Sequence, residues 1–523
     1  MKKALLLSVS FALTIAIGVT PLTSLAISSS AAASTACASV DASHFNVTSS
    51  ADSGAGSLRE ALNNAQSANG GMVCITPGLG TITLGSEINY QGSGQLTIEG
   101  NGATLSGGGA TDLLRLQGSQ VPGGPPFFST WTSLPFSMDG LNLSNASSPT
   151  DGAALWLDAV SATISNATFS GNQATGRKVG GALAMVAEQN FGSSPIGSLA
   201  ITDSSFINNS DACSDCGSDG GGAIMISYNR GAPAVTVQRS SFVGNSSSGP
   251  GGAIDSGYGG DLVVLNSTFV NNVSTGGNKN LGGAIFSTGN LHVGYSTFSG
   301  NQAIGGSAIS SAQGAAPTFH ANVFVEPSGT ASLCDRVAGS SSYNYANETA
   351  NSCGLVGSGD TSLDANDPGL GLIAKGSSPQ EYLSPGIAIK GLIPNSACAD
   401  PNISLPLTTD TDEVNSPRPG LPGGACTPGA IEPVVAVPGA PKHLRVRTDG
   451  SSVEISWRVP SSDGGNPITK YKVKASPGGK FCRTSGLSCT IYGLDPTRHY
   501  TVSVKAKNSL GFGPAKIKQN VTG

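Results

Sequence analysis

A short unit repeats five times in the middle of this chain, and this repetition constrains the fold more than any other feature. In each copy a Phe-x-x-Asn segment precedes a Gly-Gly unit, and internal repeats of this kind are typical of solenoids. The Phe-x-x-Asn segments begin at Phe169, Phe206, Phe242, Phe269 and Phe298. Successive copies are 37, 36, 27 and 29 residues apart, so each copy corresponds to one coil with loops of variable length.

Alternation within each copy identifies its elements as strands. Apolar residues lie five and seven positions before each phenylalanine and are separated by polar or small residues, which is a period of two. Stacking the coils about 4.8 Å apart places equivalent residues on one another. The apolar rows then form one core, the asparagines can form a ladder, and the Gly-Gly-Ala units allow tight corners. The pattern predicts an all-β chain built on a right-handed parallel β-helix, a solenoid.

Both ends of the predicted solenoid differ from the repeat. Ser57-Leu58-Arg59-Glu60 is a capping box that opens a short helix, which we expect to cover the first coil. Near the C-terminus, short strands with Trp457 as a core plug and Tyr500 as a tyrosine corner predict a β-sandwich. We therefore expect four segments, which are a signal peptide at 1–36, the β-helix at 37–325, irregular last coils with a C-terminal cap and a Pro-rich linker at 326–437, and the sandwich at 438–523.

The N-terminal residues and the cysteines predict an exported protein. Lys2 and Lys3 precede an apolar stretch and small-residue sites, which is the pattern of a secretory signal peptide. In an oxidising compartment the ten cysteines are expected to form disulfides, although spacing alone does not fix their connectivity. Pairing by proximity gives Cys37–Cys74, Cys213–Cys216, Cys334–Cys353, Cys398–Cys426 and Cys482–Cys489. We expect a secreted, extracellular protein, with association to the cell wall as a further option.

Several of these motifs resemble known families. The Gly-Gly-Ala-Ile and Phe-x-x-Asn units resemble the repeats of chlamydial polymorphic outer membrane proteins and related bacterial β-helix proteins. The segment from Asp52 to Glu60 resembles secreted β-helix proteins with a Ser-Leu-Arg-Glu-Ala motif, and residues 384–432 resemble the choice-of-anchor region of that group. Residues 438 to about 520 resemble a bacterial fibronectin type III module. The resemblance implies a secreted surface protein with parallel β-helix repeats.

Many β-helix proteins degrade polysaccharides, so catalysis must be considered. Hydrolysis usually needs two carboxylates roughly 5 to 9.5 Å apart, and the row after each Gly-Gly unit holds one acid, Asp255. Asp203 and Arg239 lie one coil apart in another row, and a lyase could use such an arginine as a base beside a calcium-binding aspartate. A surface ion pair or turn ladder explains this pair better. We expect no catalysis, and the alternative is an extracellular polysaccharide lyase or glycoside hydrolase.

The spacing of Cys213 and Cys216 is similar to that of zinc ligands, but no second Cys or His pair accompanies them. A disulfide-closed loop is the preferred interpretation. Asp211, Asp215 and Asp219 flank this turn and could hold calcium through oxygen ligands, although they match no known calcium loop. We therefore expect no cofactor, and calcium at these three aspartates is the alternative.

Charge is distributed unevenly along the chain. Charged residues make up only 11% of it and glycine has no three-residue period, which excludes collagen and an extended, charge-rich disordered chain. From Pro438 onward, however, 14 Lys and Arg stand against 4 Asp and Glu. Such a module could hold the protein on anionic wall polymers, or its charges could simply form a solvated face.

The sequence therefore predicts a non-catalytic adhesion or glycan-binding protein. Tyr228 and Tyr258 follow the Gly-Gly strands and could stack on sugar rings, with Asp255 as a third candidate for ligand binding. The expected partner is a cell-wall or extracellular polysaccharide, or a surface protein. We expect neither a nucleic-acid partner nor a membrane span, because the chain is exported and contains no long apolar segment after its start.

Overall fold

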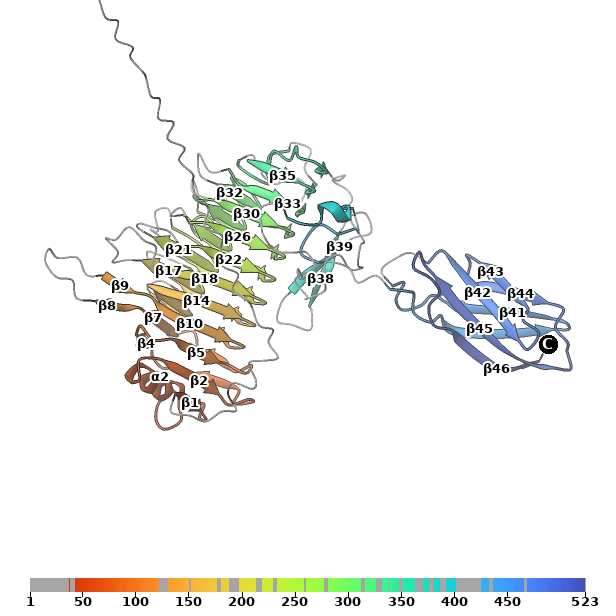
Figure 1. Ribbon diagram of the computed structural model, residues 1–523, viewed down its shortest axis with the longest axis horizontal. Helices are drawn as coiled ribbons and strands as arrows, with labels where there is room; N and C mark the ends of the chain where they lie inside the picture. The colour runs from red at the N-terminus through yellow and green to blue at the C-terminus, as the bar shows by residue number, and fades with distance from the viewer. Residues whose placement is uncertain are drawn as a thin grey trace, which may run out of the picture.

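Figure 1 shows a stack of coils followed by a separate sandwich of strands. The computed structural model describes residues 37, 43–121, 130–149, 152–175, 180–187, 197–212, 219–228, 233–257, 260–276, 281–311, 316–325, 332–336, 338–347, 351–362, 370–375, 381–385, 392–400, 425–431, 436–464 and 468–522. Among these residues, no helix combines the length and the apolar character needed to cross a bilayer.

Four sheets of parallel strands run along the stack, and each coil contributes one strand to each sheet in its central part. Sheet I consists of β1 (His44–Val47), β2 (Gly71–Ile75), β5 (Leu96–Glu99), β10 (Leu134–Asp139), β14 (Val160–Ser165), β18 (Ser198–Thr202), β22 (Val235–Gln238), β26 (Leu262–Leu265), β30 (Leu291–Gly294), β33 (Thr318–His320) and β35 (Ser340–Ser342). Sheet II consists of β3 (Thr81–Thr83), β6 (Thr104–Ser106), β11 (Asn142–Ser144), β15 (Thr168–Ser170), β19 (Ser205–Ile207), β23 (Ser241–Val243), β27 (Thr268–Val270), β31 (Thr297–Ser299), β34 (Val323–Val325), β36 (Tyr345–Ala346) and β37 (Thr361–Ser362).

The two remaining sheets of the stack are shorter. Sheet III consists of β12 (Ser147–Ser148), β16 (Gln173–Ala174), β20 (Ser210–Asp211), β24 (Ser246–Ser247) and β28 (Val273–Ser274). Sheet IV consists of β4 (Ile88–Gln91), β7 (Leu114–Gln117), β13 (Leu155–Asp158), β17 (Leu183–Ala187), β21 (Ile224–Tyr228), β25 (Ile254–Ser256), β29 (Ile285–Ser287) and β32 (Ile309–Ser311). The predicted parallel β-helix is therefore confirmed, and its sheets extend to Ser362.

The repeat stacks equivalent residues of successive coils on one another. Phe169, Phe206, Phe242, Phe269 and Phe298 are register partners in sheet II, and the ring centroids of neighbours are 4.6 to 4.9 Å apart. All five side chains are fully buried in one core that extends from Val47 to Cys353. No coil buries this face by itself, so the stack is the unit that folds.

The glycines of the Gly-Gly units stand where neighbouring coils approach most closely. A Cβ on Gly252 would collide with the backbone carbonyl oxygen of Gly283 in the next coil. Gly251, which precedes it, has a φ of +66°, a conformation that L side chains rarely adopt. The predicted tight corner is thus a consequence of both backbone conformation and lack of space.

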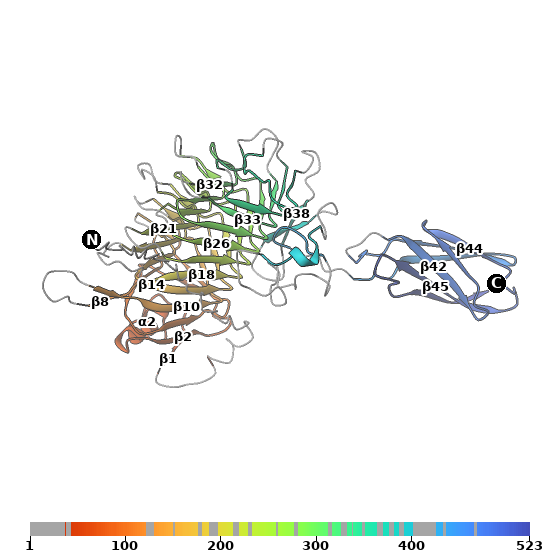
Figure 2. The ribbon, with the colours of Figure 1, turned by 45° about the horizontal axis from the view of Figure 1, so that its top comes forward.

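The α-helix α2 (Leu58–Ser67) covers the first coil, as predicted. In α2, the Ser57 hydroxyl accepts a hydrogen bond from the Glu60 backbone N–H at 3.2 Å. The Glu60 carboxylate accepts from the N–H of Gly56, one residue before the cap, at 2.6 Å. The apolar face of α2 joins the main core through Leu58 and Leu62. Figure 2 shows α2 and β1 at the end of the stack opposite β32 and β33.

Residues 392–400 and 425–431 pack against the side of the last coils. The disulfide Cys398–Cys426 lies in a small core with Tyr295, whose hydroxyl donates to the Cys398 carbonyl. The His292 ring nitrogen Nε2 lies 2.7 Å from a carboxylate oxygen of Asp400.

Three smaller elements complete the part before the sandwich. They are the short helix η3 (Asn395–Ala397), the antiparallel pair of β38 (Leu370–Lys375) and β39 (Glu381–Pro385), and the hairpin of β8 (Ser119–Val121) and β9 (Thr130–Thr132).

The C-terminal residues form a sandwich of two antiparallel sheets with its own core. The three-stranded sheet consists of β40 (Lys442–Asp449), β41 (Ser452–Arg458) and β44 (Ser488–Tyr492). The four-stranded sheet consists, in spatial order, of β43 (Phe481–Thr484), β42 (Lys470–Ser476), β45 (His499–Lys507) and β46 (Lys516–Thr522). Trp457 is buried against Tyr471, and the Tyr500 hydroxyl accepts from the backbone N–H of Asp495 at 3.0 Å, as a tyrosine corner requires.

Four of the expected disulfides are present, namely Cys37–Cys74, Cys334–Cys353, Cys398–Cys426 and Cys482–Cys489. The remaining pair, Cys213 and Cys216, lies outside the described residues.

Candidate functional site

Asp203 and Arg239 occupy equivalent corners between sheets I and II. Both residues have a positive φ, of 51° and 47°, as do Asn166, Asn266 and Tyr295 at the same corner of other coils. The Arg239 guanidinium donates from Nε to Asp203 Oδ1 at 2.9 Å and from Nη2 to Oδ2 at 2.8 Å. Both carboxylate oxygens are therefore occupied by the arginine, and a calcium ion at Asp203 would have to displace it. The geometry is that of an ion pair between adjacent coils.

Asp255 lies in the row predicted from the Gly-Gly units, with Met225 and Phe286 as its register partners. The row is not open to solvent at this point, because Asp255 is only 1% exposed. Burial raises the pKa of Asp255 well above its usual range, and the carboxylates of Asp219 and Asp211 raise it further. Its Oδ1 atom has no hydrogen-bond partner in the described part of the chain. Ile254 before it faces the main core, so Asp255 lies on the outer side of sheet IV, where a ligand could reach it only by displacing what buries it.

The other aspartate candidates are also enclosed. Asp211 and Asp219 are 4% and 9% exposed, and Asp211 Oδ1 accepts from the Ser248 backbone N–H at 3.0 Å. Asp215 and Tyr258 lie outside the described residues, and so does the side chain of Tyr228. Within the described ranges, no three His, Cys, Asp or Glu side chains come together in a way that could hold a metal ion. Calcium at the three aspartates stays the alternative to the prediction of no cofactor.

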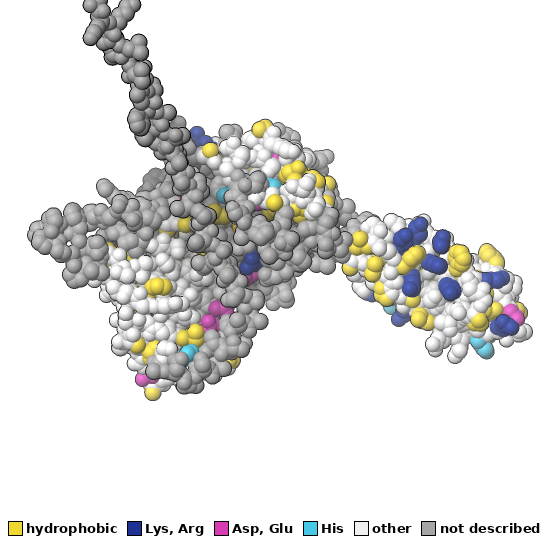
Figure 3. Space-filling view, viewed as in Figure 1, with side chains coloured by type: hydrophobic (Ala, Val, Ile, Leu, Met, Phe, Trp, Pro, Cys, Tyr) yellow, Lys and Arg dark blue, Asp and Glu magenta, His cyan; other side chains and the backbone are white. Residues whose placement is uncertain are grey.

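A different cluster stands out on the sandwich. The outer face of the four-stranded sheet carries six cationic side chains, which we call the basic face: Lys470, Lys472, Lys474, Arg483, Lys505 and Lys507. Alternation places them there, because Tyr471, Val473, Val504 and Ala506 between them are buried in the core. Figure 3 shows Lys and Arg side chains gathered on the sandwich, whereas few are visible on the β-helix in the same view.

Three of these cations form a row across the sheet. Lys472 on β42 is the register partner of Arg483 on β43 and of Lys505 on β45. Lys470 and Lys507 form a second like-charged pair, two residues further along β42 and β45 from the pair of Lys472 and Lys505. Among the described residues, none of the six forms an ion pair with an acid. Like charges directly opposite each other are destabilising in antiparallel sheets, so folding alone does not account for this arrangement.

Family comparison identifies the module that carries the basic face. Residues 439–522 match the family model described as Fibronectin type III domain. The sandwich is a fibronectin type III (FN3) domain. This confirms the predicted fold of the C-terminal segment.

Curated relatives of this chain include animal proteins whose names mention fibronectin type III domains. The chain is 30% identical over 109 residues to mouse Fibronectin type-III domain-containing protein 3A, covering 20% of this chain and 8% of the relative. It is 37% identical over 92 residues to zebrafish Ankyrin repeat and fibronectin type-III domain-containing protein 1, covering 16% of this chain and 6% of the relative. The chain thus spans less than a tenth of the length of these relatives. The resemblance to bacterial β-helix families stays a prediction.

A solved structure of a fibronectin type III domain also matches part of this chain. The sixth FN3 domain of human fibronectin type III domain containing protein 3 is 29% identical in sequence. The match covers 17% of this chain and 87% of that domain, with a TM-score of 0.15.

One aromatic side chain of the FN3 domain lies among the cations. Phe481 on β43 is 54% exposed, with the Lys472 ammonium 5.4 Å and the Arg483 guanidinium carbon 5.3 Å from its ring centroid. At the end of β45, the Lys507 ammonium, also on the basic face, lies 5.6 Å from the ring of Phe512. All three distances are in the range of cation–π contact. The basic face therefore combines positive charge with exposed apolar rings.

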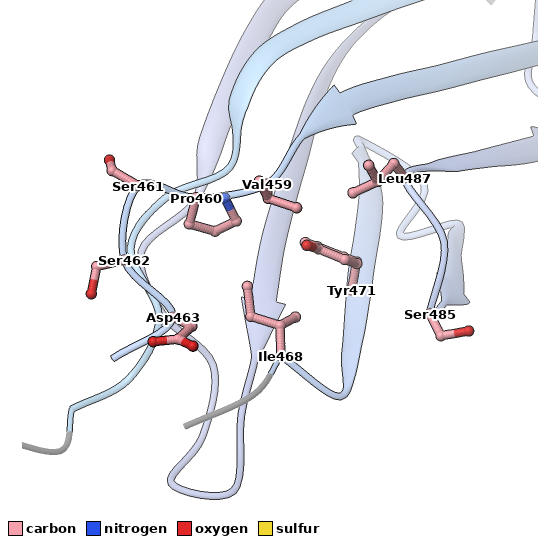
Figure 4. A pocket seen from close by; sticks show the side chains of 9 residues that line it. All are labelled: Val459, Pro460, Ser461, Ser462, Asp463, Ile468, Tyr471, Ser485 and Leu487. Atoms are coloured by element: carbon pink, nitrogen blue, oxygen red, sulfur yellow. The ribbon is translucent and has the colours of Figure 1, made fainter. Parts of the chain in front are cut away.

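The FN3 domain also has a pocket of about 700 Å³ at the end of its two sheets. Figure 4 shows Val459, Ile468 and Tyr471 directed into this space, with Leu487 beside them and Asp463 on the bordering loop. None of the six cations lines it. The pocket and the basic face are therefore separate features.

Sequence reasoning found the charge excess of the FN3 domain but not the face that holds it. Lys-Tyr-Lys-Val-Lys at 470–474 and Lys-Ala-Lys at 505–507 alternate with a period of two, which places each set on one side of its strand. This alternation is visible in the sequence and could have identified the lysines of the basic face. Phe481 and Arg483 could not be found in this way, because their position beside Lys472 depends on strand register.

Proposed function

We propose that this is an extracellular adhesion-type protein that attaches to an anionic partner through the basic face of its FN3 domain. The β-helix is then the rigid body that is held in place. The observation that carries the proposal is the row of Arg483, Lys472 and Lys505, three cations in register that form no ion pair with an acid in the described part of the chain. An anionic partner would relieve their mutual repulsion, and long-range attraction would speed its association.

Protection of sheet edges is the ordinary reason for lysines on strands, and it does not fit here. Edge strands use charges to prevent pairing with other chains. Five of the six cations lie on β42 and β45, which are the two central strands of the sheet. Their distribution is what a binding face requires, since it covers the middle of the sheet.

Extracellular location is part of the same proposal. Disulfides persist in oxidising compartments, and this chain has four of them in its described part. The predicted signal peptide at 1–36 is in accord with export. In that environment the anionic partner is an acidic polysaccharide of the cell wall or matrix, and an acidic surface protein is the alternative. Neither the Asp203–Arg239 pair nor Asp255 is needed for this role.

The test compares two triple variants of the full chain with equal changes in net charge. Lys472→Gln, Arg483→Gln and Lys505→Gln remove the row, whereas Lys442→Gln, Arg445→Gln and Arg458→Gln remove three exposed cations from the other sheet. Binding to immobilised polygalacturonate is measured over a range of salt concentrations. We expect the first triple to bind about tenfold more weakly and with less salt dependence, and the second to change little. Equal losses in both triples, or no loss in the first, would overturn the proposal.

A further inference from the structure

We infer that Phe481, Lys472 and Arg483 form a subsite for one anionic pyranose ring of an extended polysaccharide. The apolar C–H face of the sugar stacks on the Phe481 ring, and its carboxylate or sulfate group lies between the two cations. This inference rests on the proposed function and names the ligand of the basic face.

Phe481 is an exposed aromatic side chain. Its neighbour Cys482 packs against the core of the FN3 domain and forms a disulfide with Cys489, but Phe481 points to the opposite side and belongs to no core. An exposed phenylalanine on a strand at the edge of a sheet is a liability for aggregation. A binding role gives a reason for keeping it there.

Two cations lie beside the Phe481 ring. Lys472 and Arg483 both lie between 5.3 and 5.4 Å from the centroid of the same ring, and Lys474 is the register partner of Phe481. The ring is thus bordered by positive charge but remains more than half exposed. A guanidinium can bind a carboxylate or sulfate through two donors, and an ammonium adds a point charge.

The combination selects among anionic polymers. A uronate or sulfated pyranose carries a flat apolar face and an anionic group on the same ring, so both can be engaged at once. An acidic peptide has carboxylates on flexible chains and no such face next to them. Single-stranded nucleic acid would use successive aromatic platforms, whereas the row that contains Phe481 continues with Lys474 and Ser503. Beyond the first ring, the polymer follows the row toward Lys505, with cations about 4.8 Å apart from strand to strand.

The experiment uses the full chain and keeps its charge constant. Phe481→Ser removes the ring, Phe481→Tyr retains it, and Tyr492→Ser removes an aromatic side chain that is 72% exposed on the other sheet. Binding to polygalacturonate, dextran sulfate, polyglutamate and single-stranded DNA is measured by biolayer interferometry, after circular dichroism has verified folding. Polygalacturonate and dextran sulfate distinguish a carboxylate from a sulfate. Phe481→Ser removes a neutral side chain and leaves Lys472 and Arg483 in place. Weaker binding by this variant therefore cannot result from a loss of positive charge.

We expect Phe481→Ser to weaken binding to at least one of the two polysaccharides about fivefold and to leave binding to polyglutamate unchanged. Phe481→Tyr should restore the affinity, and Tyr492→Ser should have no effect. Equal losses for polyglutamate or DNA would overturn the sugar assignment in favour of those polymers. If Phe481→Ser binds as the wild type does while the Lys472, Arg483 and Lys505 triple variant is weakened, the subsite is wrong and the proposed function stands. If neither is weakened, both are wrong.

Discussion

Asn209 donates from its side-chain Nδ2 to Oδ1 of Asn245 in the next coil at 3.0 Å. The same Nδ2 donates to the Phe169 carbonyl oxygen at 3.0 Å, and the Asn209 Oδ1 accepts from Nδ2 of Asn172 at 2.9 Å. All three asparagines are fully buried, so the polar groups of each are paired only through its neighbours in the stack. This ladder makes the coils depend on one another.

Replacing one member of the ladder should therefore be costly. In Asn245→Ala, the Phe206 carbonyl oxygen and the amides of Asn209 lose buried hydrogen bonds. We expect a loss of about 3 kcal/mol in the free energy of unfolding of the β-helix, since each unpaired buried group costs about 1 to 3 kcal/mol. Urea denaturation followed by circular dichroism measures it. The control is Asn290→Ala, an exposed asparagine bonded to Asp261, which should cost under about 0.5 kcal/mol. Similar losses in both variants would contradict the prediction.

The sequence revealed this ladder because a phenylalanine marks every asparagine in it. A second ladder, at the corner between sheets I and II, went unnoticed. There the backbone N–H of Ser267 donates to the hydroxyl of Ser296, the N–H of Ser296 donates to Asn322 Oδ1, and the row continues to Asn344 and Asp360. The residue type changes along the row because any side-chain oxygen that reaches the next N–H will serve. No fixed motif identifies such a row.

The candidate site was predictable in part for a similar reason. Net charge and alternation are local properties of the sequence, and they identify Lys470, Lys472 and Lys474 as one exposed set. The row of Arg483, Lys472 and Lys505 depends on how β43 and β45 register against β42. Turn geometry and core packing fix that register, and neither can be obtained from the spacing of the lysines.

Glu99 should make the stability of the β-helix depend on pH. It is buried on β5 as the register partner of Asp139 on β10, and burial, followed by the Asp139 charge, raises the pKa of Glu99 to about 7. Between its ordinary pKa of 4.5 and about 7, the folded protein holds a proton that the unfolded chain has lost. Stability contributed by Glu99 therefore falls as the pH rises through this window.

Glu99→Gln removes the titration. We expect the variant to be more stable than the wild type by about 2 kcal/mol at pH 8 and to differ little near pH 4. Urea denaturation midpoints at several pH values provide the measurement. A difference between the two proteins that does not change with pH would show that Glu99 does not titrate in this window.

The Asp203–Arg239 corner should tolerate replacement by asparagine. The same corner holds Asn166 and Asn266 in other coils, and asparagine adopts a positive φ more readily than other side chains apart from glycine. The double variant Asp203→Asn and Arg239→Asn should keep the unfolding free energy within about 1 kcal/mol of wild type. Arg239→Ala alone should cost about 2 kcal/mol, because it leaves the partly buried Asp203 carboxylate without its arginine.

The same variants test the enzymatic alternative. Wild type and double variant are incubated with polygalacturonate, and light scattering after size separation reports the polymer length. We expect no shortening by either protein. Shortening by the wild type that is lost in the double variant would establish the alternative and assign these two residues to it.

The basic face should lower the stability of the FN3 domain while it promotes binding. Lys505 is exposed and lies directly opposite Lys472, so Lys505→Gln removes one repulsive pair and should stabilise the domain by about 0.5 kcal/mol. Arg447→Gln is the control and should destabilise the domain, because Arg447 lies opposite Glu454 and its replacement removes an attraction. Hydrogen exchange of the β42 and β45 amides under mild denaturant measures both, and at about 1 M salt both differences should shrink since exposed charges are screened. A destabilising Lys505→Gln would show that the lysine row supports the fold, and the case for a ligand would lose its main support.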